Sequence, residues 1–203
     1  MSEMSENFLE AQDPFALFDL WMSEAETAEV NDPNAMSLAT IDDKGLPDVR
    51  MILLKGSDAR GFVFYTNEDS TKGVQLNSNP KAAICLHWKS LRRQVRARGI
   101  IEPVSSEEAD AYFATRSRDS QIGAWSSRQS RPFAGENDLE EAIKQNQERF
   151  GEGEVPRPPF WKGYRIRPLE IEFWFDQNFR LHDRILFTRD HIESPWQKQR
   201  LFP

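Results

Sequence analysis

The first apolar positions of the chain recur at helical spacing. Asp13 followed by Pro14 is a typical helix start, because an Asp side chain caps free backbone N–H groups and Pro fits the first helical position. The apolar residues that follow share one face of the predicted helix: Phe15, Phe18, Trp21 and Met22. We therefore expect a helix near the N-terminus that packs on a core through one side.

From residue 35 onwards the pattern changes to short apolar segments separated by turn residues. Asp43, Lys44 and Gly45 predict a hairpin turn between the first two segments. The series predicts strands at Ala35–Ile41, 47–54, 61–65, Lys81–Trp88 and 94–104. Because strands do not alternate regularly with crossover helices, an antiparallel sheet or barrel is expected.

The second half of the chain predicts helices and then a return to strands. Ser105 with Glu108 forms a capping box before a helix over 109–115, and another helix is expected over 137–150. A Gly/Pro-rich loop covers 151–159, and strands are expected at 161–166, 171–175, 181–187 and toward Leu201. The expectation is a mainly β (α+β) protein, with an antiparallel barrel and peripheral helices in a single domain, 1–203. Residues 1–12 are expected to form a flexible N-terminus.

Composition restricts the partners of this chain. Lys and Arg number 26 against 33 Asp and Glu, giving a net charge of -7, whereas nucleic-acid binding requires a basic surface. No stretch approaches the ~20 apolar residues of a membrane-spanning helix, and no signal-peptide pattern opens the chain. Cys85 is the only cysteine, so no internal disulfide can form. We expect a cytoplasmic protein with no nucleic-acid or membrane partner.

Positive charge is nevertheless concentrated locally. Residues 70–101 contain no Asp or Glu, although Lys and Arg recur throughout this segment. A second basic group consists of Arg116, Arg118, Arg128 and Arg131. Local basic pockets in an acidic protein suit small phosphorylated ligands. The alternative is a solvated basic face.

Arg180, His182 and Arg184 form the densest group of polar residues. On a strand they would share one face, because alternate side chains point the same way. Two cations and a titratable ring on one face suit an anion or a phosphate group. An exposed charged strand is the alternative.

A second candidate phosphate site combines a phenol, a guanidinium and a hydroxyl. Tyr112, Arg116 and Ser120 are four residues apart and would share a helix face if the helix continues to Ser120. Arg50 and Lys55 bound an apolar strand and would face opposite ways on it, so they need not serve the same ligand group.

Other chemistries find little support. Cys85 and His87 share a strand face, but two ligands do not make a zinc site, and no metal is expected. The sequence contains no G-x-S-x-G, P-loop or G-x-G-x-x-G motif. What remains is a phosphate-binding barrel whose chemistry would require a bound cofactor.

Several segments, in order along the chain, resemble the pyridoxine/pyridoxamine 5'-phosphate oxidase family. The C-terminal signature combines Glu172-Phe173-Trp174 with the segment from Arg180 to Arg184. The likeness continues through 50–55, 64–67, 70–73, 93–95, 118–125, 129–130, 156–161 and 200–203. The resemblance implies a homodimer of FMN-binding split barrels with two flavin sites at the subunit interface.

The resemblance also implies functional residues and a reaction. FMN contacts are implied at Arg50, Met51, Ile52, Leu53, Leu54, Lys55, Tyr65, Thr66, Thr71, Lys72, Gln94, Gln129, Ser130, Trp174 and Arg184. The substrate phosphate would be bound by Lys55, Tyr112, Arg116 and Ser120, and Arg180 and His182 are the catalytic candidates that hold the pyridine ring. The implied reaction oxidises pyridoxamine or pyridoxine 5'-phosphate with O2 to pyridoxal 5'-phosphate in vitamin B6 biosynthesis and salvage. It releases hydrogen peroxide, and ammonia from the amine.

Three features depart from the family pattern. Phe175 replaces a polar residue, commonly Gln; Thr71 replaces an Arg beside Lys72; and the N-terminus lacks a basic, Tyr-containing segment. These departures bear on affinity and on closure over the substrate. Two alternatives remain: a split-barrel flavoprotein with another substrate, such as a flavin reductase, or a non-catalytic protein that binds FMN or pyridoxal phosphate.

Overall fold

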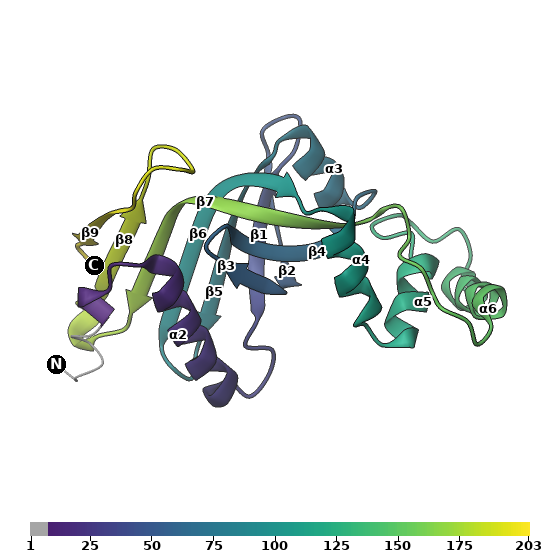
Figure 1. Cartoon of the computed structure of the whole chain (residues 1–203), viewed down its shortest axis with the longest axis horizontal. Helices are drawn as coiled ribbons and strands as arrows, with labels where there is room; N and C mark the ends of the chain where they lie inside the picture. Colours follow the sequence, from purple (N-terminus) through teal and green to yellow (C-terminus); the bar gives the residue numbers. More distant parts are fainter. Residues whose placement is uncertain (1–7) are drawn as a thin grey trace.

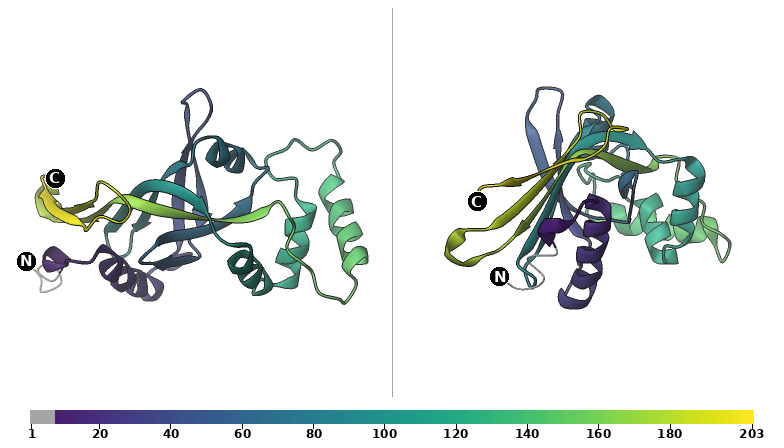
Figure 2. Two further views of the ribbon diagram at one scale, coloured as in Figure 1. Left: turned by 45° about the horizontal axis from the view of Figure 1, so that its top comes forward. Right: turned by 60° about the vertical axis from the view of Figure 1, so that its left-hand side comes forward.

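The structure is a computed structural model that describes residues 8–203. Within this range nine strands form one antiparallel sheet in the order β2-β1-β5-β6-β7-β4-β3, with β8 and β9 added beside β7. Figures 1 and 2 show a curved sheet with helix α2 against one face and α4, α5 and α6 beyond one end. The predicted antiparallel barrel with peripheral helices is confirmed in this curled, half-barrel form.

The strands and helices have the following limits. The strands are β1 (Ala35–Ile41), β2 (Pro47–Leu53), β3 (Gly56–Asp58), β4 (Gly61–Asn67), β5 (Lys81–Trp88), β6 (Arg93–Pro103), β7 (Trp161–Phe175), β8 (Asp183–Thr188) and β9 (Gln197–Leu201). The helices are α2 (Pro14–Ala28), α3 (Thr71–Ser78), α4 (Ser106–Ala114), α5 (Arg118–Ser126) and α6 (Asp138–Phe150), with a 3-10 turn at Asn178–Arg180.

Helix α2 begins where the sequence predicts. The Asp13 carboxylate accepts a hydrogen bond from the Phe15 N–H at 2.8 Å. Phe18 and Trp21 are 0% and 3% exposed. Their rings pack 4.8 Å from Phe62 and 5.2 Å from Phe173, respectively. Burial of an apolar side chain of this size contributes roughly 1.5–3 kcal/mol, so α2 is joined to the sheet mainly through its apolar face.

Strand β7 corrects the prediction of two separate strands at 161–166 and 171–175. It runs without interruption through both, and its register against β6 shifts between Arg98 and Gly99, opposite Pro168. Proline has no backbone N–H to donate to the hydrogen bonds between strands. Within a sheet it is therefore tolerated at a bulge such as this one. Gly99 permits the close approach, since a Cβ there would lie 2.0 Å from the Arg167 carbonyl oxygen. The long strand pairs with β4 over one half and with β8 over the other.

Helices α3 and α5 were not predicted. Their sequences are polar and short, and each begins at a Ser cap, Ser70 and Ser117 respectively. Helices α4, α5 and α6 share a smaller apolar cluster with the start of β7, built on Phe113, Ile122 and Trp161. This cluster places three helices at the end of the sheet where β4 and β7 meet (Figure 1).

The expected flexible N-terminus over 1–12 stays a prediction. Residues 1–7 lie outside the described residues, but Phe8 is 3% exposed and packs 5.2 Å from the Trp21 ring. Within residues 8–203, no helix has both the length and the apolar character needed to cross a membrane.

Candidate active site

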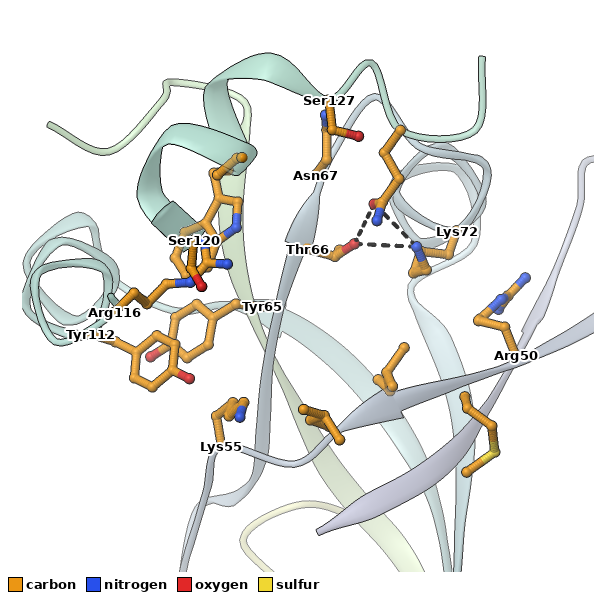
Figure 3. A pocket seen from close by; sticks show the side chains of 17 residues that line it. Arg50, Lys55, Tyr65, Thr66, Asn67, Lys72, Tyr112, Arg116, Ser120 and Ser127 are labelled. Carbon is orange, nitrogen blue, oxygen red and sulfur yellow. Dashed lines mark hydrogen bonds between the residues drawn. The ribbon is translucent and has the colours of Figure 1, made fainter. Parts of the chain in front are cut away.

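A cleft of about 490 Å³ lies at the helical end of the sheet. Figure 3 shows its walls: β2 and the chain after it on one side, α4 and α5 on the other, and β4 between them. Of the described residues that line it, four are Lys or Arg and none is Asp or Glu. Such a cleft concentrates anions. The predicted site residues brought together here are Arg50, Met51, Ile52, Leu53, Lys55, Tyr65, Thr66, Lys72, Tyr112, Arg116, Ser120 and Gln129.

Lys72, in the first turn of α3, forms one end of the cleft. Its Nζ lies 3.4 Å from Thr66 Oγ1 and 3.3 Å from Gln129 Oε1 (Figure 3). The hydrogen bonds of this ammonium in the described part of the chain all go to neutral oxygens. Burial, and after it the charge of Arg50, lowers the pKa of Lys72. A buried cation without a carboxylate partner is costly, and an anionic ligand would relieve that cost.

Arg50, on β2, lies at the same end and is held in place by a polar network. Its guanidinium donates to Thr40 Oγ1 at 2.6 Å and to Gln75 Oε1 at 3.1 Å, and it forms an ion pair with Asp48. Thr40 and Gln75 are buried, at 1% and 8% exposure. The Arg50 head group is therefore fixed before any ligand arrives, which favours binding because less side-chain entropy is lost.

The opposite end of the cleft collects Lys55, Tyr112, Arg116 and Ser120. The condition for a shared helix face, a helix that continues to Ser120, is not met, because α4 ends at Ala114 and Ser117 caps a new helix. The Ser117 hydroxyl accepts from the Ser120 N–H at 3.4 Å, and such caps compete with helix continuation. The change of direction between α4 and α5 still leaves all four residues on the cleft.

Arg116 carries a polar atom that the described residues leave unsatisfied. Its Nη1 is buried without a hydrogen-bond partner. The guanidinium carbon lies 5.1 Å from the Trp161 ring centroid and 5.6 Å from that of Phe113. Burial lowers the pKa of Arg116. A buried donor of this kind costs free energy unless an acceptor reaches it, and a phosphate oxygen is a suitable acceptor.

Three further predicted residues form a row across the sheet. In the register, Gln94 of β6 is opposite Trp174 of β7, which is opposite Arg184 of β8. Residues directly opposite one another share a face of the sheet. The Arg184 guanidinium is held by Glu172 at 2.9 Å. None of the three lines the cleft of its own protomer, among the residues described.

Arg180 and His182 lie on the turn between β7 and β8. The prediction that Arg180, His182 and Arg184 share a strand face is wrong, because β8 begins only at Asp183. Phe179 and Arg180 have φ values of 59° and 63°, so the chain reverses here and strand periodicity is lost. The His182 ring lies 4.6 Å from the Trp174 ring, and its Nδ1 lies 3.0 Å from Asp176 Oδ1.

The remaining predicted positions lie outside the cleft. Leu54 is 5% exposed and its side chain belongs to the main core. Thr71 is exposed on α3, and Ser130, with a φ of 67°, lines a smaller neighbouring pocket. No cluster of three or more potential metal-binding side chains occurs in the described part of the chain.

Sequence reasoning missed some cleft residues. Asn67, Ser127 and Trp161 line the cleft, although none had been assigned a role. Asn67 and Trp161 end two of the segments that carry the family resemblance, and that position is the signal that could have found them. Ser127 follows the unpredicted helix α5, so no comparable signal marked it.

The curled antiparallel sheet with a cationic cleft at its helical end defines the class of this protein as a split barrel. Residues 22–149 match the family described as pyridoxamine 5'-phosphate oxidase. Residues 161–203 match the pyridoxine 5'-phosphate oxidase C-terminal dimerisation region. The chain belongs to the pyridoxine/pyridoxamine 5'-phosphate oxidase family, and the match to the dimerisation region indicates a homodimer.

Known relatives support this membership over nearly the whole chain. A pyridoxine/pyridoxamine 5'-phosphate oxidase of Azorhizobium caulinodans is 59% identical over 199 residues, 98% of this chain and 94% of that protein. The Maricaulis maris protein of the same name is 62% identical over 191 residues, 94% of this chain and 86% of that protein. The crystal structure of PhzG from Burkholderia lata, in complex with tetrahydrophenazine-1-carboxylic acid, has a TM-score of 0.89 at 30% identity. It covers 96% of this chain and 94% of the other.

Proposed function

We propose that the protein oxidises pyridoxamine or pyridoxine 5'-phosphate with molecular oxygen to pyridoxal 5'-phosphate, using bound FMN. The products would be pyridoxal 5'-phosphate and hydrogen peroxide; with the amine substrate, water is also consumed and ammonia is released. The observation that carries this proposal is a cleft with a cationic group at each end and no carboxylate among its described lining residues. Two separate groups of this kind suit two phosphorylated ligands, a cofactor and a substrate.

Family membership implies a flavin cofactor, and FMN in particular suits the end of the cleft at Lys72. Its single phosphate would satisfy the buried ammonium of Lys72 and the preset guanidinium of Arg50. Beside them, Met51 and Leu53 project from β2 with exposures of 65% and 40%. These side chains would offer apolar surface to the flat ring system.

The end of the cleft at Arg116 suits the substrate phosphate. Lys55 and Arg116 would supply positive charge, and Tyr112 and Ser120 would supply hydroxyl donors. The buried Nη1 of Arg116 has no hydrogen-bond partner among the described residues, so a ligand that supplies a hydrogen-bond acceptor would be favoured at this end. A site that leaves a buried donor unpaired without a phosphate would discriminate against unphosphorylated vitamers.

The row of Gln94, Trp174 and Arg184, with the turn carrying Arg180 and His182, would complete the site of the other protomer. In a homodimer these residues can face the partner's cleft, whereas within one protomer they do not line it. The β7–β8 turn would then present Arg180 to the substrate ring. This arrangement would give a role to Arg180, which is exposed on the β7–β8 turn and forms no ion pair with another described residue.

The contribution of the chain to the reaction would be positioning and electrostatics. The redox chemistry would come from FMN when it is bound: removal of a hydride equivalent, two electrons and one proton, from the C4' carbon of the substrate, with O2 as the final electron acceptor. Lys55, Tyr112 and Arg116 would anchor the phosphate and so set the distance of C4' from the ring system. Arg180 would orient the reacting carbon, and His182, held between Trp174 and Asp176, would hold a ring substituent.

The visible spectrum of the purified protein tests this function. We expect a yellow protein that bleaches on anaerobic addition of pyridoxamine 5'-phosphate and recovers in air as pyridoxal 5'-phosphate forms. A yellow protein that does not bleach would point to another substrate or to a non-catalytic flavin-binding protein. A protein that stays colourless after incubation with FMN would contradict the cofactor.

A further inference from the structure

Three aromatic rings beside the cleft are mutually parallel. The Tyr65 ring lies 4.2 Å from Tyr112 and 4.9 Å from Trp161, with an interplanar angle of 5° in both pairs. Tyr112 and Trp161 are 6.1 Å apart at 4°. The rings come from β4, α4 and β7, so this stack joins the sheet to the helices that carry the proposed phosphate-binding residues (Figure 3 shows Tyr65 and Tyr112).

The stack also supports Arg116. The Arg116 guanidinium lies 5.1 Å from the Trp161 ring centroid, yet its buried Nη1 has no hydrogen-bond partner among the described residues. No carboxylate forms an ion pair with this arginine in the described part of the chain. Its position is therefore set by packing against aromatic faces, mainly that of Trp161, and an aromatic face attracts a cation without consuming its N–H donors.

We propose that Trp161 is a positioning residue that holds Arg116 ready for the 5'-phosphate of the substrate. An acidic partner in its place would neutralise the arginine and occupy its donors, whereas the Trp161 ring leaves both charge and donors available. Trp161 is 7% exposed and is fixed in turn by Tyr65 and by the edge of Phe113 at 5.1 Å. The inference rests on the proposed function, because it takes the phosphorylated substrate as the ligand of Arg116.

Gly163 preserves this arrangement. It lies opposite Tyr65 in the pairing of β4 with β7. A Cβ at this position would lie 2.6 Å from Tyr65 Cε1 and 2.4 Å from Val104 Cγ2. Any larger residue at this position must therefore displace the Tyr65 ring, and the stack that supports Trp161 with it.

The experiment compares three tryptophan variants in the flavin-loaded protein. Trp161→Leu removes the aromatic face, Trp161→Phe keeps one, and Trp125→Leu is the matched control. Trp125 belongs to the same apolar cluster as Trp161 but packs on Phe150 and Arg149 and does not line the cleft. The readouts are Kd for pyridoxal 5'-phosphate by absorbance titration, and KM and kcat for pyridoxamine 5'-phosphate.

We expect Trp161→Leu to raise Kd and KM about tenfold with kcat changed less than about threefold, and Trp161→Phe to retain most of the affinity. Trp125→Leu should leave both constants unchanged. Equal effects of Trp161→Leu and Trp125→Leu, or a loss confined to kcat, would overturn the inference. If Trp161→Leu does not fold, Gly163→Ala tests the same stack and should raise KM in the same direction.

Failure of the proposed oxidase function can be distinguished from failure of the role proposed for Trp161. A wild-type protein that binds pyridoxal 5'-phosphate but does not oxidise the amine would contradict the oxidase, while the Kd series would still test the role of Trp161. A wild-type protein that does not bind pyridoxal 5'-phosphate would overturn the inference itself.

Discussion

Lys72 and Phe175 have contrasting surroundings in the structure. Lys72 is a buried cation whose hydrogen bonds within residues 8–203 go to neutral oxygens, which supports the proposed phosphate-binding role. Phe175 packs 6.4 Å from the Phe8 ring and beneath the Arg93 guanidinium at 5.5 Å, so it is arranged for the core. The departure of Phe175 from the family pattern therefore has a structural explanation in its own neighbours.

Replacing Lys72 by Met should weaken FMN binding and leave the fold intact. Loss of a charge-assisted contact to a phosphate should raise the Kd for FMN by ~10- to 100-fold, and titration of flavin fluorescence measures this change. Lys89→Met is the matched control, because Lys89 is exposed and outside the cleft. An unchanged Kd in Lys72→Met would remove Lys72 from the phosphate site.

Burial of Lys72 should also make stability depend on pH in the flavin-free protein. Because its pKa is lowered in the folded chain, the unfolded chain binds more protons in the window between the lowered and the ordinary value. The free energy of unfolding of the wild type should therefore rise with pH through this window, relative to Lys72→Met. Urea unfolding of both proteins across the alkaline range measures the difference, and parallel curves would contradict the effect.

Phe175→Gln should lower stability rather than restore a flavin contact. The change removes an aromatic surface from between Phe8 and Arg93, and we expect a loss of roughly 1–3 kcal/mol in the free energy of unfolding. Denaturant unfolding measures this loss, and the Kd for FMN should stay within about twofold of the wild type. Tighter FMN binding in the variant would show instead that Gln at this position contacts the flavin.

At the scale of elements, the sequence predicts those strands and helices whose limits are set by local residue patterns. Strands Ala35–Ile41 and Lys81–Trp88 have the predicted limits, because apolar alternation and turn residues bound them. The end of α4 at Ala114 lies within one residue of the predicted end at Thr115. Helix α5 was missed, because its short polar sequence and its cap at Ser117 carry no apolar periodicity.

The β7–β8 turn could not be predicted for a related reason. The left-handed residues Phe179 and Arg180 are not glycines, so no residue type marked the reversal. The resemblance could nonetheless bring distant residues such as Lys72 and Gln129 to one cleft, which periodicity alone could not do.

At the scale of the whole molecule, the predicted site residues form two groups that lie apart within one protomer. Lys72, Arg50 and Arg116 line the cleft. Trp174 and Arg184 instead lie opposite each other where the C-terminal half of β7 pairs with β8. Figure 1 shows β8 and β9 at the end of the molecule away from α4, α5 and α6. A symmetric dimer can bring one group of each chain against the other group of its partner, giving two equivalent sites.

This arrangement predicts that two inactive chains can restore one another. In a heterodimer of Arg116→Ala and Arg180→Ala chains, a shared site would combine the intact cleft of one chain with the intact turn of the other, and the second site would carry both defects. The heterodimer, isolated through two different tags, should therefore have about half the activity of the wild-type dimer. A heterodimer of Arg116→Ala and Lys55→Ala is the control, because both changes fall in the cleft and every site stays defective. If Arg180 served the cleft of its own chain, the first heterodimer would be as inactive as its parents, because neither chain would contain an intact site.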